Sequence, residues 1–333
     1  MKSATTKAVI LGSGSWGCAL AIVLSEHFKE VVLIGRSENQ AEEINSHHTN
    51  IHYLPKIKLP ENIRCTTDLT EARTAEIIVF VVPTSATRDT SLKLAEMGIP
   101  AHIPLISSAK GIERGTGLRM SNIIFEALPN NPIAVLSGPT HAEEVAANLA
   151  TCTVVGSIDE KLTSRLQEMF TTPTFRTYTT NDVAGMELGG ALKNVFAIAA
   201  GIASGIGLGD NAIAALVTRG LAEMTRLGIA LGGQPETFVG LSGVGDLMTT
   251  CYSPHSRNNR VGKALGEGLS LQQACDQLGM VAEGVPNTLS IYEAAKETDI
   301  ETPIIDAVYH VLYQDKPAKQ ALHELLTRDP KAE

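Results

Sequence analysis

Three glycines follow the first apolar run of the chain at the spacing Gly12-x-Gly14-x-x-Gly17. The run Ala8–Leu11 precedes them, a helical pattern follows them, and a second apolar run, Val31–Ile34, comes within about 30 residues. In this order the first glycine permits a tight turn, the second lets backbone approach a pyrophosphate, and the third lets helix and strand pack closely. The pattern predicts a dinucleotide-binding loop; a plain structural turn is the alternative.

Short runs rich in β-branched residues alternate with helical patterns as far as Asn181. Such alternation is typical of a parallel sheet covered by helices on both faces. Most of the runs show little polar alternation, as expected of strands buried on both sides. The expected strands are Ala8–Leu11, Val31–Ile34, Ile77–Val82, Ile103–Ser107, Ile133–Leu136 and Thr153–Gly156, and the expected helices include Cys18–Phe28, Asn39–Ser46 and Leu118–Ala127.

After Asn181 the strand-like runs vanish and helical patterns continue to the end, punctuated by Gly, Asn and Pro. A chain of 333 residues is long for one core. The sequence therefore predicts an α/β protein with two domains, a doubly wound sheet over 1–181 and an all-helical domain over 182–333. The expected helices of the second domain are 182–206, 211–231, 257–266, 270–278, 284–297, 303–313 and 317–327.

Composition excludes several classes of protein. The formal net charge of −9 disfavours binding to nucleic acid and to acidic membranes. No apolar run reaches the roughly 20 residues that span a bilayer, and the N-terminus lacks the pattern of a signal peptide. The five cysteines are scattered without paired spacing, and His47–His48 fits a solvated helix end. We therefore expect a cytoplasmic protein with no membrane insertion, no disulfide framework and no metal site.

The end of the second expected strand bears on the choice of cofactor. NAD sites usually carry Asp or Glu at this tip to hold the ribose 2′-hydroxyl, whereas this chain has Gly35–Arg36. A guanidinium can receive a 2′-phosphate or stack on adenine. Arg36 therefore favours NADPH and leaves NADH possible; a solvated surface arginine is the alternative.

One lysine stands in a segment where lysine is costly. Residues 185–207 are almost all small or apolar, so a helix here would be buried nearly all round, and its only formal charges are Glu187 and Lys193. Desolvation disfavours an ammonium and lowers its pKa toward neutrality. Lys193 is therefore a candidate for proton transfer; a lysine that reaches solvent from the helix edge is the alternative.

Two further stretches follow expected strands. Lys110 lies just beyond the carboxyl end of one strand, where ligands of open α/β sheets bind. Thr140 follows the next strand as a plausible N-cap of a helix, with Glu143 and Glu144 in its first turn. A well-capped helix start would also explain these two glutamates.

The helical part supplies a possible anion grip. Ser256, Arg257 and Asn258 follow one another where a helix is expected to begin, and offer a hydroxyl, a guanidinium fork and an amide beside free backbone N–H groups. Asp246 and Thr250 lie shortly before them. A solvated, arginine-rich helix start is the alternative.

Taken together, these blocks resemble the bacterial NAD(P)-dependent glycerol-3-phosphate dehydrogenases over about residues 7–326. Several independent blocks in the correct order make this resemblance far more specific than any single one, and no catalytic position departs from the pattern. The matching blocks are GSGSWG, AKGIE at 109–113, SGPTHAEE at 137–144, LGGALKNVFAIAAG at 188–201, TRGLAEMTRLG at 218–228, GLSGVGDLMTTC at 240–251, SRNNRVG at 256–262 and VAEGVPNT at 281–288.

The resemblance implies a Rossmann domain followed by a helical domain of the 6-phosphogluconate-dehydrogenase type, usually in a homodimer. It implies reversible hydride transfer between NADPH or NADH and dihydroxyacetone phosphate, giving sn-glycerol 3-phosphate for phospholipid synthesis. Lys193 would donate and accept the proton, with Lys110 and Asp246 tuning and orienting it.

The resemblance also implies two sets of contacts. Asn194 and Thr250 would support the substrate site, and Tyr53 would lie near the adenine. The cofactor contacts would be Gly12, Gly14, Ser15, Trp16, Gly17, Arg36, Lys110, Ala142, Arg257, Val281 and Glu283, and the substrate contacts Lys110, Gly138, Thr140, Lys193, Asp246, Ser256, Arg257 and Asn258.

Two other functions remain open on the sequence. One is a lysine-dependent dehydrogenase of the same architecture acting on a 3-hydroxy acid or a sugar acid, whose carboxylate Arg257 could hold. The other is a non-catalytic NADPH-binding module, which would not need Lys193, Asp246 or Arg257.

Overall fold

The computed structural model describes residues 5–328, which form two compact units. The first, here the sheet unit, takes in the chain up to residue 109 and residues 119–183, and the second, the helical unit, takes in 110–118 and the chain from 184 onward. This division differs from a single boundary at 181/182 because 110–118 belongs with the helices. Ile112 in that segment is buried in the core of the helical unit.

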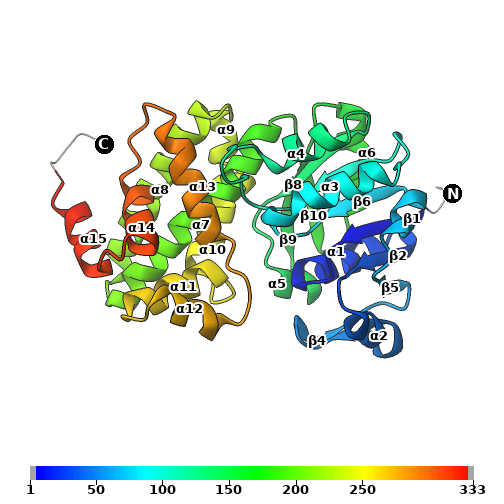
Figure 1. Ribbon diagram of the computed structural model, residues 1–333, viewed down its shortest axis with the longest axis horizontal. Helices are drawn as coiled ribbons and strands as arrows, with labels where there is room; N and C mark the ends of the chain where they lie inside the picture. Colours follow the sequence, from blue (N-terminus) through cyan, green and yellow to red (C-terminus); the bar gives the residue numbers. More distant parts are fainter. Residues whose placement is uncertain (1–4, 329–333) are drawn as a thin grey trace. The chain divides into compact units, whose positions relative to one another are not determined.

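The sheet unit is built on one eight-stranded sheet with the strand order β10-β9-β8-β7-β6-β1-β2-β5 (Figure 1). Within it β5-β2-β1-β6-β7-β8 are all parallel and follow the 3-2-1-4-5-6 order of a dinucleotide-binding fold. The strands are β1 Thr5–Leu11, β2 Phe28–Ile34, β5 Ile63–Thr66, β6 Ile77–Phe80, β7 Leu105–Ser107, β8 Ile133–Ser137, β9 Thr151–Gly156 and β10 Phe175–Thr180, and a separate pair comprises β3 Thr49–Asn50 and β4 Leu54–Lys58.

The expectation of a wholly parallel sheet is wrong at β9, which runs antiparallel to β8. A parallel neighbour needs a crossover long enough to carry the chain back along the sheet. The connection from β8 to β9 contains only the five-residue helix α5, Ala142–Ala146, so β9 starts near the edge where β8 ends. β10 then pairs parallel to β9.

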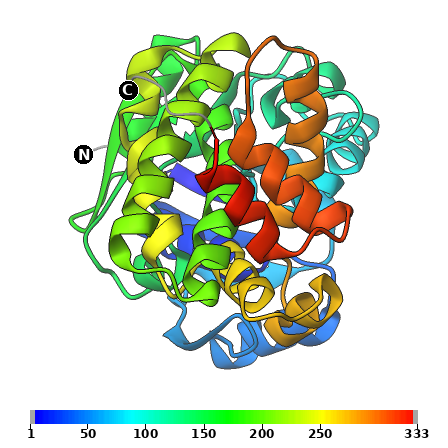
Figure 2. The same ribbon diagram turned by 90° about the vertical axis from the view of Figure 1, so that its left-hand side faces the viewer.

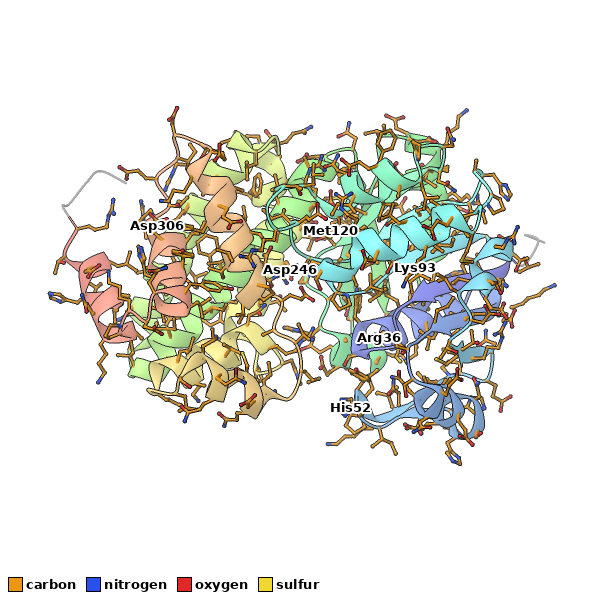
Figure 3. All side chains as sticks on the ribbon, viewed as in Figure 1. Arg36, His52, Lys93, Met120, Asp246 and Asp306 are labelled. Atoms are coloured by element: carbon orange, nitrogen blue, oxygen red, sulfur yellow. The ribbon has the colours of Figure 1, made fainter. Side chains whose placement is uncertain are left out.

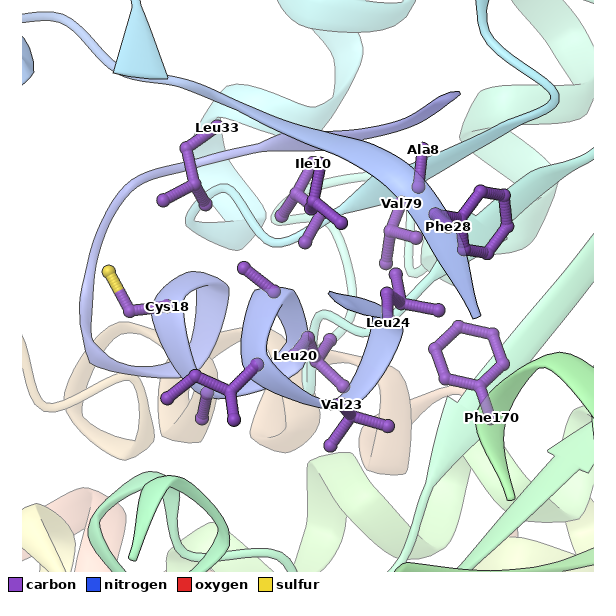
Figure 4. Packing of buried hydrophobic residues seen from close by; sticks show 14 of the residues in the cluster. Ala8, Ile10, Cys18, Leu20, Val23, Leu24, Phe28, Leu33, Val79 and Phe170 are labelled. Atoms are coloured by element: carbon purple, nitrogen blue, oxygen red, sulfur yellow. The ribbon is translucent and has the colours of Figure 1, made fainter. Parts of the chain in front are cut away.

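Alternate residues of the central strand β1 enter two different cores. Ala8 and Ile10 pack with Leu20 and Leu24 of α1, Ser15–Ser25, as Figure 4 shows. Val9 and Leu11 face the opposite side, in the core that contains residues of α3, Thr87–Glu96, and α4, Met120–Ala127. A strand buried on both faces explains why its sequence is apolar throughout.

The helices of the sheet unit lie close to their expected positions. The helix expected over Cys18–Phe28 is α1, but it ends at Ser25, and Phe28 begins β2. The other helices are α2 Glu38–His47, α3 Thr87–Glu96, α4 Met120–Ala127, α5 Ala142–Ala146 and α6 Glu160–Phe170, with 3₁₀ turns at Leu69–Thr74 and Thr84–Ala86.

The helical unit contains every helix expected after residue 181, drawn green through red in Figure 2. A short helix, a π-helical turn and the helix that carries Asp246 were not expected. The fold class, a Rossmann-type sheet followed by a helical part, is confirmed. The helices are α7 Val183–Ile206, α8 Asp210–Ala230, α9 Pro235–Phe238, α10 Asp246–Tyr252, α11 Arg257–Gly266, α12 Leu271–Leu278, α13 Gly284–Lys296, α14 Pro303–Tyr313 and α15 Ala318–Leu326, and the π-helical turn is Leu241–Gly245.

Small residues let other backbone segments approach the central helix α7. A Cβ added at Gly189 would lie 2.4 Å from the carbonyl oxygen of Ser242, and one at Gly201 would lie 2.1 Å from that of Asn259. By length and composition α7 could cross a membrane, but 83% of its apolar window is buried inside the structure. It is the core helix of this unit.

Candidate active site

The glycine loop of the sheet unit joins β1 to α1. Gly12 has φ +121°, a conformation that favours glycine, and a Cβ there would lie 2.8 Å from the carbonyl oxygen of Val81. A Cβ on Gly17 would lie 2.0 Å from the carbonyl oxygen of Gly12. The first and third glycines are thus required by the loop itself.

Gly14 is different because space remains beside it. The nearest atom to an added Cβ would be in the ring of Tyr53, at 3.8 Å. Gly14 is also the N-cap of α1, and no side chain caps this helix end. An uncapped helix N-terminus beside an open glycine fits a pyrophosphate, so these residues fit the dinucleotide that the sequence predicts.

Polar side chains outside the glycine motif fix the loop. The amide Nδ2 of Asn50 and the amide Nε2 of Gln40 donate to the carbonyl oxygen of Ser13, at 2.9 and 2.8 Å. The Ser15 hydroxyl donates to the carbonyl oxygen of Tyr53 at 3.0 Å. Tyr53 therefore lies beside the loop, and Asn50 and Gln40 are structural partners that the sequence analysis missed.

Arg36 lies two residues after the end of β2, and its side chain is exposed (labelled in Figure 3). The residue before it must be small, because a Cβ on Gly35 would lie 2.6 Å from the Ser13 hydroxyl. The next acidic residue, Glu38, accepts a hydrogen bond from Thr67. The tip of β2 thus presents a cation where an NAD site usually has a carboxylate.

The expectation that Thr140 caps a helix is wrong. The N-cap of α5 is His141, without a side-chain capping bond, and the Thr140 hydroxyl instead donates to the carbonyl oxygen of Gly138 at 3.1 Å. Gly138 has φ +132° and follows β8, so the chain turns sharply there. Ala142, another predicted contact, begins α5, and Glu143 and Glu144 lie in its first turn.

In the helical unit three predicted residues meet around the carboxylate of a fourth, Asp246 (labelled in Figure 3). Lys193 of α7 donates to Oδ1 of Asp246 and, at 2.7 Å, to the hydroxyl of Thr250. Lys110 donates to the other carboxylate oxygen, Oδ2, also at 2.7 Å. The Thr250 hydroxyl in turn donates to the carbonyl oxygen of Asp246 at 2.6 Å, one turn earlier in α10.

Burial sets the protonation behaviour of this cluster. Burial lowers the pKa of Lys193 to about 7. The Asp246 carboxylate opposes this shift, and the nearby Lys110 cation adds to it. Burial alone would raise the pKa of Asp246, but Lys110 and Lys193 outweigh it and hold that pKa below its ordinary value. Lys193 can therefore give up and regain a proton near neutral pH while Asp246 stays ionised.

Asn194 and Asn258 connect this cluster to neighbouring helices. Asn194 donates to the carbonyl oxygen of Lys110 at 3.3 Å and accepts from the amide of Asn258 at 2.9 Å. Asn258 accepts from the backbone N–H of Gly284 at 2.9 Å, at the start of α13. The bonds fix the side-chain amide of Asn258 in one orientation.

The predicted anion grip lies at the start of α11. Ser256 is the N-cap, as its position suggested, and its hydroxyl accepts from the backbone N–H of Asn259 at 3.2 Å. Arg257 is exposed, and its Nη1 donates to the carbonyl oxygen of Val281 at 2.9 Å. Glu283 occupies the N-cap position of α13 without a side-chain capping bond. Predicted cofactor and substrate contacts thus meet here within the helical unit.

Among residues 5–328 no cluster of three or more His, Cys, Asp and Glu side chains is arranged to hold a metal ion. A proton-transfer group needs a titratable side chain that polar neighbours hold in place. The buried lysine and carboxylate, with a hydroxyl between them, form such a group.

Comparison with known proteins identifies the family. The NAD-dependent glycerol-3-phosphate dehydrogenase N-terminus matches residues 7–163, and the C-terminus of the same family matches 182–323. Glycerol-3-phosphate dehydrogenase [NAD(P)+] of Enterococcus faecalis is 46% identical over 331 residues, which cover 98% of this chain and 97% of that protein. The enzyme of the same name from Halothermothrix orenii is 47% identical over 327 residues, 97% of this chain and 95% of that protein.

A solved structure agrees with this assignment. Glycerol-3-phosphate dehydrogenase from Coxiella burnetii superposes with a TM-score of 0.92 at 38% sequence identity, covering 97% of this chain and 99% of that one. The chain that matches these relatives over nearly its whole length thus contains the sheet unit with its glycine loop and the helical unit with its buried lysine cluster. The chain belongs to the NAD-dependent glycerol-3-phosphate dehydrogenase family and is an NAD(P)-dependent oxidoreductase.

Proposed function

We propose that the protein transfers a hydride reversibly between NAD(P)H and dihydroxyacetone phosphate, giving sn-glycerol 3-phosphate. The family assignment supports the substrate pair. The observation that carries the chemistry is the buried Lys193, whose pKa is about 7 and whose ammonium is held by Asp246 and Thr250. Such a lysine can serve as acid in one direction and as base in the other.

The bound nicotinamide cofactor supplies the hydride, and the protein supplies the proton and the geometry. As the carbonyl is reduced, negative charge develops on the C2 oxygen of the substrate. The Lys193 ammonium stabilises that charge and donates its proton there. In the oxidative direction neutral Lys193 takes the proton from the C2 hydroxyl.

Lys110 and Asp246 tune Lys193 in opposite directions. The carboxylate favours the ammonium, and the Lys110 cation disfavours it. Thr250 accepts from Lys193 at 2.7 Å, which leaves the ammonium fewer orientations. The proton is thus held at a defined place, from which transfer to a positioned substrate is efficient.

The substrate phosphate is held at the start of α11 in this proposal. A guanidinium has five N–H donors, so the single bond from Arg257 to Val281 leaves donors for a phosphate. Ser256 and Asn258 flank Arg257, and the helix N-terminus favours an anion. Lys110, Gly138 and Thr140 complete the proposed substrate contacts by their positions in the family motifs.

The cofactor is proposed to bind on the glycine loop, with NADPH preferred. Gly14 supplies the open approach to the helix N-terminus, and Arg36 supplies a cation for the 2′-phosphate. The remaining proposed contacts are Gly12, Ser15, Trp16, Gly17, Lys110, Ala142, Arg257, Val281 and Glu283.

In the cell we propose a cytoplasmic homodimer that makes sn-glycerol 3-phosphate for phospholipid synthesis, without membrane insertion or nucleic-acid binding. The functional domains are proposed as 1–181 for the cofactor and 182–333 for the substrate, with Lys110–Leu118 contributing to the latter. The net charge of −9 supports a ligand site that depends on local cations.

One side-by-side assay tests the proposal. NADPH and NADH oxidation would be followed with dihydroxyacetone phosphate, and NADP and NAD reduction with 3-hydroxy acids and sugar acids. We expect turnover with dihydroxyacetone phosphate only. Turnover of the hydroxy acids alone would favour the related dehydrogenase, and NADPH binding without any turnover would favour a non-catalytic module.

A further inference from the structure

The segment Lys110–Leu118, here the Lys110 loop, belongs to the helical unit although β7 and α4 on either side belong to the sheet unit. The loop is closed by two backbone bonds, from Glu113 N–H to the carbonyl of Leu118 at 2.8 Å and from Gly117 N–H to the carbonyl of Glu113 at 3.0 Å. Ile112 is buried in the helical core. The first residues of the loop are therefore part of the helical packing.

Two side-chain amides hold the backbone on either side of Gly111. Asn194 donates to the carbonyl oxygen of Lys110, at 3.3 Å. The backbone N–H of Ile112 donates to Oδ1 of Asn287 at 3.1 Å, and Nδ2 of Asn287 donates to the carbonyl oxygen of Ala191 in α7 at 2.8 Å.

Asn287 is thus a bridge between the Lys110 loop and α7. It is only 2% exposed. Its amide oxygen accepts from the loop, and its amide nitrogen donates to α7. A buried amide bonded at both ends fixes the distance between the two backbones it joins. The bridge reaches α7 at Ala191, two residues before Lys193.

The same loop carries the charge that opposes protonation of Lys193. The charged or titratable groups that face Lys193 are Asp246 and Cys251 from α10 and Lys110 from the loop. The Lys110 ammonium lies 2.7 Å from a carboxylate oxygen of Asp246, and the position of the Lys110 backbone determines whether the side chain can reach it. Any displacement of that backbone moves a cation away from the buried pair.

We propose that Asn287 is a positioning residue for the reaction, which ties the Lys110 loop to α7 and so keeps the Lys110 ammonium beside Asp246 and Lys193. The proposal rests on the proposed function, since Lys193 is taken as the proton donor. Asn287 touches neither reacting group and acts through Lys110. The alternative is that Asn287 only anchors α13, in which case its loss destabilises the protein without altering Lys193.

The two roles differ in their effect on protonation. Moving Lys110 away removes a like charge from Lys193, so the pKa of Lys193 rises. Dihydroxyacetone phosphate reduction needs the ammonium, so the alkaline limb of its kcat profile shifts to higher pH. A loss of packing alone lowers the melting temperature and leaves the limb in place.

The test compares Asn287→Ala and Asn287→Ser with the matched control Thr288→Val. Thr288 lies next to Asn287 in α13, is fully buried, and its hydroxyl donates to the carbonyl oxygen of Gly284 at 2.6 Å, within its own helix rather than to the Lys110 loop. We expect the alkaline limb to rise by about one pH unit in the Asn287 variants. The control is expected to lose thermal stability with its limb unchanged.

A second readout does not depend on turnover. The rate of acetylation of Lys193 by acetic anhydride, followed by peptide mass spectrometry as a function of pH, reports its deprotonation in the protein without cofactor. Its midpoint should rise by about one unit in Asn287→Ala and stay in place in Thr288→Val. The serine hydroxyl keeps a polar group in the buried site but is too short to reach both partners, so Asn287→Ser should behave in the same way.

The outcomes separate the two hypotheses. No turnover of dihydroxyacetone phosphate by the unmodified protein would refute the proposed function, while the acetylation midpoint would still decide the role of Asn287. An unchanged midpoint in the Asn287 variants overturns the positioning role. Failure of both Asn287 variants to fold overturns it as well, in favour of a structural role.

Discussion

Lys193 of α7 and Asp246 of α10 form an ion pair whose side chains are only 7% and 2% exposed. Burial of such a pair costs desolvation free energy, which the mutual attraction of the charges only partly offsets. Here the cost falls mainly on the lysine, whose pKa is about 7, while two cations keep the aspartate ionised. Both protonation states of Lys193 are therefore accessible near neutral pH, as a reversible proton transfer requires.

Replacement of Lys193 should remove nearly all turnover. Loss of a general acid typically costs 10²–10⁴-fold in rate, so kcat of Lys193→Ala should fall by roughly that factor. NADPH affinity should change little, because the proposed phosphate contacts lie on the glycine loop. The control is Lys263→Ala, which removes a half-exposed lysine of the same unit. Retention of more than about a tenth of kcat would exclude Lys193 as the main proton donor.

Asp246→Asn should shift the pH profile in the opposite direction from the Asn287 variants. The carboxylate favours the Lys193 ammonium, so its removal lowers the pKa of Lys193 further. The alkaline limb of dihydroxyacetone phosphate reduction should move down by about 1–3 units. The buried Lys193 and the partly buried Lys110 also lose this carboxylate, which should lower the free energy of unfolding by about 3–5 kcal/mol.

Asp306→Asn is the control for this change. Asp306 lies on α14 and pairs with the half-exposed Lys296 at 3.2 Å (Asp306 is labelled in Figure 3). Its loss should cost about 1 kcal/mol or less and leave the pH profile unchanged. The kcat–pH profiles and the urea unfolding curves of both variants test these two expectations. A limb that stays in place in Asp246→Asn would contradict the tuning role of this carboxylate.

The parts of the site that the sequence predicted are those where a residue conflicts with its surroundings. Lys193 could be found because a single lysine in an otherwise apolar helix is costly to bury. Gly12, Gly14 and Gly17 could be found because a dinucleotide-binding loop needs glycine at this spacing, for the tight turn, the approach to the pyrophosphate and the packing of helix on strand. Arg36 was conspicuous because it replaces an expected carboxylate.

The missed parts are side chains whose partners lie far away in the chain. Asn287 bonds to Ile112 and Ala191, separated from it by 175 and 96 residues. Asn50 and Gln40 lie in polar stretches, where an amide has no periodic pattern that marks it. The direction of β9 was missed for a related reason, since it depends on the length of a helix in the preceding connection rather than on the strand's own composition.

Arg36→Asp tests the preference for NADPH. If the guanidinium receives the 2′-phosphate, a carboxylate in its place repels that group and suits a free 2′-hydroxyl. The KM for NADPH should rise far more than that for NADH. Arg73→Asp, an exposed arginine of the same unit, is the control and should affect neither. Equal losses for both cofactors would show that Arg36 only stacks or packs.

Glu223 should give the helical unit a pH-dependent stability. This carboxyl of α8 is 1% exposed and accepts from the backbone N–H groups of Ile304 and Ile305, at 3.1 and 2.9 Å. Burial raises its pKa to about 7, against the lowering effect of those two bonds. Because the folded-state pKa exceeds the unfolded value, the folded protein loses stability as pH rises from about 4.5 through 7, by up to about 3 kcal/mol.

Glu223→Gln cannot titrate at this position. Its free energy of unfolding, measured with urea from about pH 5 to about pH 8, should therefore vary less with pH than that of the unmodified protein. Glu267→Gln, which removes a half-exposed glutamate, should keep the original dependence. Parallel stability curves for the unmodified protein and Glu223→Gln would contradict the assignment of this titration to Glu223.

The phosphate grip distinguishes the proposed substrate from those of related dehydrogenases. Arg257 lies next to the N-cap Ser256, in a protein whose net charge of −9 would otherwise repel an anion. Arg257→Lys keeps the charge but loses the bidentate geometry, and Arg257→Ala loses both. The kcat/KM for dihydroxyacetone phosphate should fall in the order unmodified protein, Lys, Ala, with a loss for Ala of about 2–4 kcal/mol.

Dihydroxyacetone is the matched substrate for this series, because it has the same carbonyl and lacks the phosphate. Its turnover should lose far less on either Arg257 change than that of dihydroxyacetone phosphate, since only the proposed cofactor contact of the guanidinium is then affected. A loss of kcat/KM that both substrates share would come in part from the bond between Arg257 and Val281, which both substitutions remove or weaken. The informative quantity is therefore the ratio of kcat/KM between the two substrates across the three proteins. A ratio that stays constant would mean that Arg257 does not hold the phosphate, and the assignment of a phosphorylated substrate would lose its structural support.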